Sequence, residues 1–229
     1  MVDEQVRDQT FVQVLALRLD PAWRRLADEE RERATAEFAR VVESTRREVL
    51  MESYSLVGLR ADVDLVFMRF ASSLVQLEET ASQVLGAGMG RWMTVARSFL
   101  GLTRPSRYVR KPGAQEQAII SGERGAYLVV YPFTKTHDWY RLSREARQGM
   151  MSEHIRVGHD FPQVRQLLAY STGLDDHEFI VAYETDDLPA FQDLVIALRE
   201  TEARRFTLND QPILTGIHRP LQDALRLLR

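Results

Sequence analysis

The sequence predicts an α+β protein that is built from two similar units. In each half of the 229-residue chain, the apolar residues are spaced as for a strand, a helix, two strands, a helix and a strand, in that order. The order β-α-β-β-α-β is that of a ferredoxin-like unit. Equivalent residues of the two halves also stand at a constant separation along the chain, which indicates a duplicated unit.

In the first half, apolar residues alternate over residues 11–19 and stop before Asp20-Pro21, which predicts a strand followed by a turn. Phe38 and Val42 then share one face among many charged residues, which is typical of an amphipathic surface helix. The predicted strands of this half are residues 11–19, 49–57, 62–70 and 92–100, and the predicted helices are residues 28–47 and 73–85.

The second half repeats this pattern. Ser143 is a plausible N-cap for its first helix, and Phe191, Leu194 and Leu198 form one apolar stripe on its second helix. A β-branched and aromatic run precedes Pro132, which predicts a strand that breaks there into a polar corner. The predicted strands are residues 126–133, 164–171, 177–184 and 213–217, and the predicted helices are residues 143–158 and 188–204.

Residues of the two halves match at an offset of 114, as for Asp62 and Asp176 (176 − 62). The other pairs are Leu65 with Phe179, Leu74 with Leu188, and Leu77 with Phe191. We therefore divide the chain into an N-terminal ferredoxin-like unit at 1–103, a connector at 104–123 and a C-terminal unit at 124–229. Two such units can pack their sheets face to face with the helices outside.

The connector carries two prolines, and four cations stand within eight of its residues. Such a charge run is usually a solvated linker. It can also be a clamp for carboxylates, because an arginine such as Arg110 binds carboxylates through its forked guanidinium and Tyr108 can add a hydroxyl donor. The sequence leaves both interpretations open.

Composition excludes several function classes. A net charge of −3 and a pI near 6.0 disfavour nucleic-acid binding. The absence of cysteine excludes disulfides, thiolate catalysis, zinc-thiolate sites and iron–sulfur clusters. No apolar run has the length of a membrane span, and the polar, acidic N-terminus does not have the pattern of a signal peptide. We expect a soluble cytoplasmic protein, unless a leader has been removed.

A tyrosine, a lysine, a tryptophan and a histidine come together at one strand–loop–helix corner, as Tyr131, Lys135, Trp139 and His154. This mixture suits a site better than a core. On a helix, His154 shares a face with Met150 and Met151, so a satisfied core histidine beside core methionines is the simpler interpretation.

A zinc site is less plausible, because His154 and His159 are five residues apart and no His-Glu-x-x-His pattern occurs. A single buried imidazole can instead hold a haem iron from one side. Glu202, on the late helix, is a candidate carboxylate to fix the tautomer of His154, with Glu200 or solvent as alternatives.

Several segments together resemble the chlorite dismutase superfamily, which includes the coproheme decarboxylases. The segments are Gly101–Tyr108, Tyr131-Pro-Phe-Thr-Lys135, Trp139-Tyr140, Met150-Met151-x-x-His154, Ser171-Thr-Gly-Leu-Asp-Asp-His-Glu-Phe179 and Thr215-Gly-Ile-His. They cover nearly the whole chain in the order of the family. The resemblance implies a dimeric α+β barrel formed by two ferredoxin-like units within one chain, with haem in the C-terminal unit, and assembly into homopentamers.

The resemblance also implies roles for single residues. His154 falls on the proximal iron ligand, and Glu202 falls most nearly on the carboxylate that bonds it. Lys135, Trp139 and Tyr108 match positions that line the porphyrin or bind its propionates.

The branches of the family differ at two positions. Chlorite dismutases have a distal arginine where this chain has Gln166, with Arg165 beside it. Glutamine there, and Tyr131 before Pro132, are features of the decarboxylase branch. The segment from Tyr170 onward resembles the dismutase branch more closely. A register shift of one residue would exchange the faces of Gln166 and Arg165, so only one of them can point at the iron.

The leading hypothesis is a coproheme decarboxylase, in which iron coproporphyrin III is both substrate and redox centre for hydrogen peroxide. Tyr131 would become the radical that attacks a propionate, Lys135 would position that propionate, and Gln166 would be a neutral distal donor. One alternative is chlorite dismutation to chloride and dioxygen on haem b, with Arg165 as the distal guide. Another is a haem-binding carrier or sensor that performs no chemistry.

Overall fold

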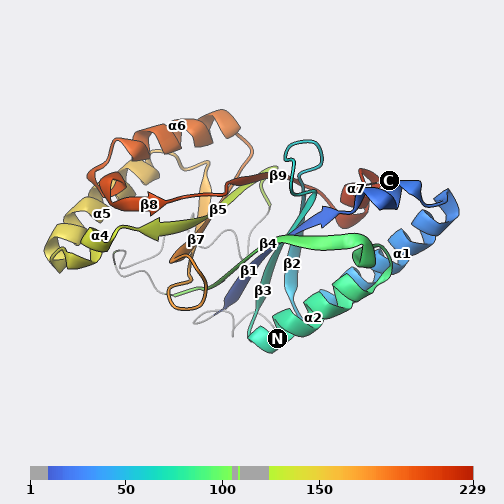
Figure 1. The fold of residues 1–229 in the computed structure, drawn as a ribbon. Helices are drawn as coiled ribbons and strands as arrows, with labels where there is room; N and C mark the ends of the chain where they lie inside the picture. The colour runs from blue at the N-terminus through green and yellow to red at the C-terminus, as the bar shows by residue number, and fades with distance from the viewer. Residues whose placement is uncertain (1–9, 105–107, 109–123, 229) are drawn as a thin grey trace. The chain divides into compact units, whose positions relative to one another are not determined.

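The computed structural model describes residues 10–104, 108 and 124–228. The chain forms two compact units, one made of residues 1–103 with 216–229 and one made of residues 104–215. Each unit packs helices on an antiparallel sheet (Figure 1). The α+β fold class predicted from the sequence is therefore confirmed.

In the described part of the first unit, strands β4, β1, β3 and β2 lie side by side in that order, each antiparallel to its neighbour. Its elements are β1 (Phe11–Leu19), α1 (Asp28–Thr45), β2 (Leu50–Ser55), β3 (Leu65–Ala71), α2 (Leu74–Gly86) and β4 (Met93–Leu102), with the 3-10 helices η1 (Pro21–Arg25) and η2 (Gly88–Trp92). The order of strands and helices is the predicted β-α-β-β-α-β.

The core of the first unit lies between its sheet and its helices. Alternate residues of β1, such as Leu15 and Leu17, pack with Phe38 and Val42 of α1 and with the fully buried Trp23. The alternation of β1 and the apolar stripe of α1 thus meet as the sequence pattern predicts.

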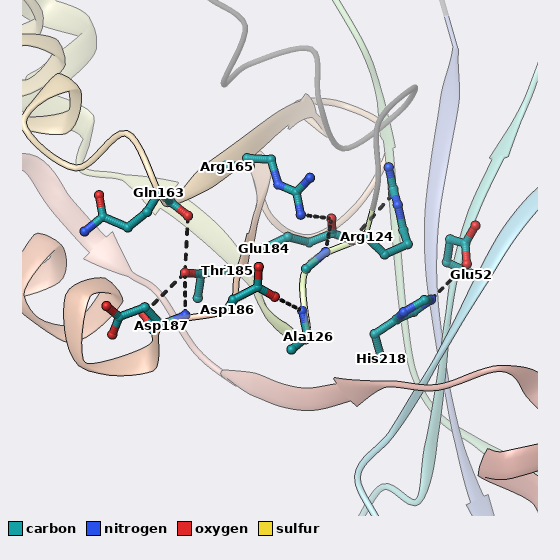
Figure 2. Close-up of polar contacts among 11 residues, drawn as sticks. Glu52, Arg124, Ala126, Gln163, Arg165, Glu184, Thr185, Asp186, Asp187 and His218 are labelled. Carbon is teal, nitrogen blue, oxygen red and sulfur yellow. Dashed lines mark hydrogen bonds and ion pairs between the residues drawn. The ribbon is translucent and has the colours of Figure 1, made fainter.

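The C-terminal segment packs in the first unit, although the division by chain order assigned it to the second. Its elements are the end of β9 (Leu214–His218) and α7 (Leu221–Arg226). His218 stands opposite Tyr54 of β2, and its Nε2 lies 3.2 Å from Oε2 of Glu52 (Figure 2). The indole N–H of Trp23 donates to the carbonyl of Leu228 at 2.9 Å. Burial of apolar residues from α7 in this core explains the difference.

The second unit has strands in the order β6-β7-β5-β8, again antiparallel. Its elements are β5 (Tyr127–Lys135), α4 (His137–Arg141), α5 (Arg144–His159), β6 (Arg165–Tyr170), β7 (Phe179–Thr185), α6 (Leu188–Arg199), the 3-10 helix η3 (Glu202–Phe206) and β8 (Thr207–Asn209). In Figure 1, α5 and α6 run alongside this sheet.

Among the predicted boundaries that differ from the structure, two affect the candidate site. Pro132 does not end β5, because Thr134 and Lys135 continue the strand by pairing with β8. The predicted helix 188–204 ends at Arg199, and the hydroxyl of Thr201 then donates to the carbonyl of Leu198 at 2.7 Å, which satisfies one of the last helical carbonyls. The short elements α4 and β8 were not predicted.

Candidate functional site

The expected iron ligand, His154, lies on α5, whose N-terminus Ser143 caps by accepting a hydrogen bond from the amide of Ala146 at 3.2 Å. Nδ1 of His154 lies 3.5 Å from Oγ1 of Thr201. The Thr201 hydroxyl gives its only proton to the carbonyl of Leu198, so it accepts from Nδ1–H. The lone pair of the neutral ring is therefore on Nε2, which has no hydrogen-bond partner among the described residues.

The surroundings of His154 keep it neutral. Burial lowers the pKa of His154 to about 4, and the positive charge of Lys135 acts in the same direction. A neutral imidazole with a free Nε2 is the form that ligates a metal. In the described part of the chain, no group of three or more His, Asp or Glu side chains could hold a metal ion. A single neutral imidazole is the ligand with which a protein can hold the iron of a porphyrin from one side.

Glu202 does not supply the carboxylate expected at His154. It begins η3, and its carboxylate lies 3.2 Å from Nη1 of Arg205, with both side chains more than half exposed. Its amide donates to Oε2 of Glu153 at 3.1 Å. The imidazole contacts the preceding residue, Thr201, because α6 ends early and turns that hydroxyl inward. A neutral hydroxyl thus takes the place predicted for a carboxylate.

Lys135 presents a half-buried positive charge that acts on His154. Its Nζ donates to the carbonyl of Ala203 at 3.1 Å and lies 4.3 Å from the centre of the Trp139 ring. The pKa of Lys135 is lowered to about 8, first by burial and then by the charge of Arg204, while Glu178 opposes the shift. Lys135 forms no ion pair with the residues that the structure describes, so its ammonium group is suited to receive a carboxylate.

An aromatic corner surrounds Lys135. Trp139 is buried, with ring centroids 6.4 Å from Tyr108 and 5.7 Å from Phe206. Gln148 of α5 donates to the carbonyl of Tyr108 at 3.3 Å. The structure thus brings the predicted porphyrin-lining residues Tyr108 and Trp139 together. Arg110, also predicted to bind the porphyrin, lies outside the described residues.

Tyr131 lies on β5 with its ring centroid 6.2 Å from that of Tyr183 on β7. Burial raises the pKa of Tyr131, so the side chain is a neutral phenol at pH 7. The same phenol experiences the charges of Arg204 and Asp210, which pair with each other at 2.6 Å. Arg204 also lowers the pKa of Lys135. The positive charge of Arg204 therefore acts on both Tyr131 and Lys135.

The strand register determines which of two neighbouring β6 residues shares a face with Tyr131. Gln166 stands opposite Tyr183, and Arg165 stands opposite Glu184. Opposed residues point to the same face, and successive residues point to opposite faces. Tyr131 stands opposite Val181, which is two residues from Tyr183 on β7. Tyr131 therefore shares the face of Tyr183 and Gln166.

Helix α6 covers this same face. Leu194 and Phe191 of α6 pack in one cluster with Tyr183 and Tyr131. We refer to the side of the second sheet that carries Tyr131, Tyr183 and Gln166 as the site face.

Arg165 lies on the opposite face, where it binds a buried carboxylate. Its Nη2 lies 3.6 Å from Oε2 of Glu184, a residue with no exposed surface. Nη1 of Arg124 lies 3.5 Å from the other carboxylate oxygen, and the amide of Gly125 donates to Oε2 at 3.4 Å (Figure 2). Removing Arg165 from this network would leave a buried charge with less compensation.

The described residues fit an iron porphyrin with carboxylate substituents. Helix α5 buries none of its residues, although Met150, Met151 and Ile155 are apolar and half-buried. A helix on a sheet normally buries an apolar stripe, so these side chains can be covered by a flat apolar ligand. His154 offers a neutral ligand nitrogen, and Lys135 offers a charge for a carboxylate.

Sequence reasoning missed three residues of this site, Thr201, Arg204 and Tyr183. No pattern singled out Thr201 or Arg204, because their positions follow from the early end of α6. Tyr183 had a signal in its alternation with Val181 along β7, which places both on one face.

Comparison with known proteins adds the evolutionary context. The family model described as chlorite dismutase matches residues 31–219. A coproheme decarboxylase of Mycolicibacterium smegmatis is 34% identical over 165 residues, which are 71% of this chain and 70% of that protein. A chlorite dismutase of Ideonella dechloratans is 26% identical over 226 residues, or 95% of this chain and 79% of that protein.

Solved structures show the same relationship. A mutant chlorite dismutase from Candidatus Nitrospira defluvii superposes with a TM-score of 0.87 at 31% identity, covering 95% of this chain and 94% of that one. Among the described residues, no helix is both long and apolar enough to span a membrane.

Proposed function

Since the chain belongs to the chlorite dismutase family, we propose that it is a hydrogen peroxide-dependent coproheme decarboxylase, which converts iron coproporphyrin III to haem b. One observation carries this choice within the family. Tyr131 and Gln166 share the site face, whereas Arg165 is bound to Glu184 on the opposite face. The identity with the coproheme decarboxylase of Mycolicibacterium smegmatis supports the same choice.

Two residues would bind the porphyrin, and a third would orient one of them. His154 would hold the iron through Nε2, with Thr201 fixing its tautomer. Lys135 would receive a propionate, because its ammonium group lies on the Trp139 ring and, among the described residues, hydrogen-bonds only to the neutral carbonyl of Ala203. When bound, the iron porphyrin supplies, together with peroxide, the oxidising power of the reaction.

Tyr131 would carry the reaction to the propionate. It would give up one electron and its phenolic proton and become a neutral radical, because a buried phenol with a raised pKa does not ionise first. The radical would take a hydrogen atom from the propionate β-carbon and return to the phenol. The substrate radical would then lose carbon dioxide and a second electron, which leaves a vinyl group.

The overall change balances for each propionate. The side chain loses one carbon dioxide and two hydrogen atoms, and the two electrons and two protons released reduce one hydrogen peroxide to two water molecules. The conversion of coproheme to haem b therefore consumes two peroxide molecules.

Gln166 would act as a neutral donor beside the bound peroxide. Its side chain is on the site face, and its amide N–H₂ can donate a hydrogen bond without adding a charge. Chlorite dismutation, the first alternative, would place an arginine there to stabilise an anionic oxygen. The pairing of Arg165 with Glu184 disfavours that alternative.

The proposal is tested by adding peroxide to coproheme-loaded wild-type protein and to a Tyr131→Phe variant, and separating the porphyrins by chromatography. We expect the wild type to form haem b, and we expect Tyr131→Phe to bind coproheme with an unchanged absorption spectrum but to leave it intact. The control is Tyr127→Phe, which removes a hydroxyl from the same strand. Formation of haem b by Tyr131→Phe at the wild-type rate would refute the role of Tyr131.

The alternatives give different results in the same sample. Dioxygen release from chlorite over repeated turnovers would indicate chlorite dismutation. Tight binding of coproheme by the wild type without any product would indicate a haem carrier or sensor.

A further inference from the structure

Arg147 of α5 differs from the other half-buried arginines in the described part of the second unit. Arg124, Arg165 and Arg204 each pair with a carboxylate. Arg147 forms no ion pair with the residues that the structure describes, and its buried Nε has no hydrogen-bond partner among them. A buried donor in a native protein normally has a partner, so this guanidinium is suited to bind a further group.

The stability of α5 does not explain an arginine at this position. Arg147 lies in the first turn of the helix, whose N-terminal end carries a partial positive charge and disfavours a cation. Its aliphatic stem can pack on apolar neighbours, but that contact does not require a guanidinium. The charged group therefore points to a negatively charged partner outside the helix.

Arg147 shares the face of α5 that carries His154. The two residues are seven apart (154 − 147), and Met150 and Met151 stand between them, about one turn from each. At a rise of about 1.5 Å per residue, Arg147 stands about 10 Å from His154 along the helix. A porphyrin plane lies across the bond from iron to its axial nitrogen, so a ring bound at His154 would extend along this face. Arg147 would then stand at the rim, where the ring carries its carboxylates.

The same end of α5 adjoins the aromatic corner of the site. The next residue, Gln148, donates to the carbonyl of Tyr108 at 3.3 Å, and the Tyr108 ring lies 6.4 Å from that of Trp139. Burial raises the pKa of Tyr140, which follows Trp139 on α4, and the positive charge of Arg147 opposes that rise. Arg147 therefore belongs to the surroundings of the residues that are expected to line the porphyrin.

We propose that Arg147 is a second porphyrin-binding cation, whose guanidinium receives a carboxylate at the rim of the ring. Arginine can donate two parallel hydrogen bonds to one carboxylate, which suits it to this task. Lys135 belongs to β5 and Arg147 to α5, so a porphyrin with several carboxylates can bind both cations. The inference rests on the porphyrin site of the proposed function and does not depend on the reaction.

The affinity for metal-free coproporphyrin III, measured by tryptophan quenching, tests this role without any reaction. We expect Arg147→Gln to weaken binding about tenfold, the effect of losing a hydrogen bond to a charged group. Arg147→Lys should bind with intermediate affinity, because it keeps the charge without the fork. The matched control Arg144→Gln removes an exposed arginine from the same turn and should bind as the wild type does. Unchanged affinity in Arg147→Gln would overturn the proposal.

The tetra-amide of coproporphyrin III separates a contact with a carboxylate from an indirect change in the shape of the site. It has the same ring as coproporphyrin, but its side chains carry no charge. We expect the wild type and Arg147→Gln to bind the tetra-amide equally. If Arg147→Gln weakens binding of the acid and of the tetra-amide by the same factor, Arg147 does not bind a carboxylate and the proposal is wrong.

The two proposals fail in different ways. If peroxide forms no haem b from coproheme bound to the wild type, the proposed function is wrong, and the titrations with metal-free porphyrin still decide the role of Arg147. If the wild type forms haem b and Arg147→Gln binds coproporphyrin as tightly as the wild type, the inference about Arg147 alone is wrong.

Discussion

Burial lowers the pKa of two basic side chains of the site. The pKa of Lys135 is lowered to about 8 and that of His154 to about 4, in each case chiefly through burial. At pH 7 the site therefore combines a charged ammonium group with a neutral imidazole. The charged ammonium group of Lys135 is suited to bind a carboxylate, and the neutral imidazole of His154 is suited to bind an iron.

The lowered pKa of Lys135 predicts a pH dependence of porphyrin binding. The ammonium group loses its proton as the pH rises through about 8, so affinity for metal-free coproporphyrin should fall above that pH. Tryptophan quenching on titration with coproporphyrin measures the affinity. We expect Lys135→Arg to remove the fall, because arginine stays charged, and Lys135→Gln to bind weakly throughout. Constant wild-type affinity between about pH 7 and about pH 9 would contradict this assignment.

The lowered pKa of His154 predicts a pH dependence of stability. The unfolded chain binds a proton at the ordinary pKa of histidine, near 6.5, whereas the folded protein binds it only near pH 4. The contribution of neutral His154 is fully present above about pH 6.5 and is lost as the pH falls toward 4. Urea unfolding of porphyrin-free protein measures this loss.

The matched variants for that measurement are His154→Gln and, as control, the exposed His137→Gln. We expect His154→Gln to lose less stability on acidification than the wild type. Equal pH profiles for His154→Gln and the wild type would show that folding does not favour the neutral form of His154.

Among single residues, Tyr131, Lys135, Trp139 and His154 were predicted as one corner, because they stand close together in the sequence around one strand and one helix. Glu202 shows the limit of such reasoning. Its choice assumed a helix to residue 204, and the early end of α6 gives the contact to Thr201 instead. Helix ends depend on local side-chain hydrogen bonds that periodicity does not reveal.

At the level of elements, the duplication extends to the helix caps. Oγ of Ser73 accepts from the amide of Gln76 at 3.2 Å at the start of α2, and Oδ1 of Asp187 accepts from the amide of Ala190 at 3.0 Å at the start of α6. Ser73 and Asp187 are again 114 residues apart (187 − 73). The repeated unit thus retains the position of a cap and changes the residue that provides it.

These equivalent caps allow a matched test of the role of α6. Ser73→Ala and Asp187→Ala should each lower the free energy of unfolding by about 1 kcal/mol, because each removes an N-cap hydrogen bond. Only Asp187→Ala should weaken coproporphyrin binding, since α6 places Phe191 over the site face. Urea unfolding and fluorescence titration provide the two measurements. Equal effects of both variants on binding would contradict the separate role of α6.

The order and type of the main elements were predictable because periods of two and of 3.6 residues differ clearly over ten or more residues. The continuation of β5 beyond Pro132 was not predictable, because it depends on pairing with β8, a strand of only three residues. The faces of Gln166 and Arg165 were also open, since a one-residue shift leaves the sequence pattern of a short strand unchanged.

At the level of the whole molecule, the boundary of the two units does not follow the repeat. The repeat assigns the end of the chain to the second half, but Leu225 and Leu228 are buried with Trp23 in the first unit. Sequence order alone could not show this, because an apolar helix face does not specify which core it enters.

The placement of α7 predicts the effect of truncating Leu225. Leu225→Ala should lower the free energy of unfolding by about 2–5 kcal/mol, because it opens a cavity beside Trp23 and Phe38. The control Leu208→Ala removes a side chain that is 70% exposed and should cost less than about 0.5 kcal/mol. Urea unfolding followed by tryptophan fluorescence measures both. A cost for Leu225→Ala no larger than for Leu208→Ala would refute the assignment of α7.

We propose that this chain removes carboxyl groups from coproheme with Tyr131 and Gln166 on one sheet face. The most direct measurement is to titrate the wild-type coproheme complex with hydrogen peroxide and to follow the mass of the porphyrin. We expect two successive losses, each of one carbon dioxide and two hydrogen atoms for each peroxide consumed. A porphyrin mass that stays constant while peroxide is consumed would contradict it.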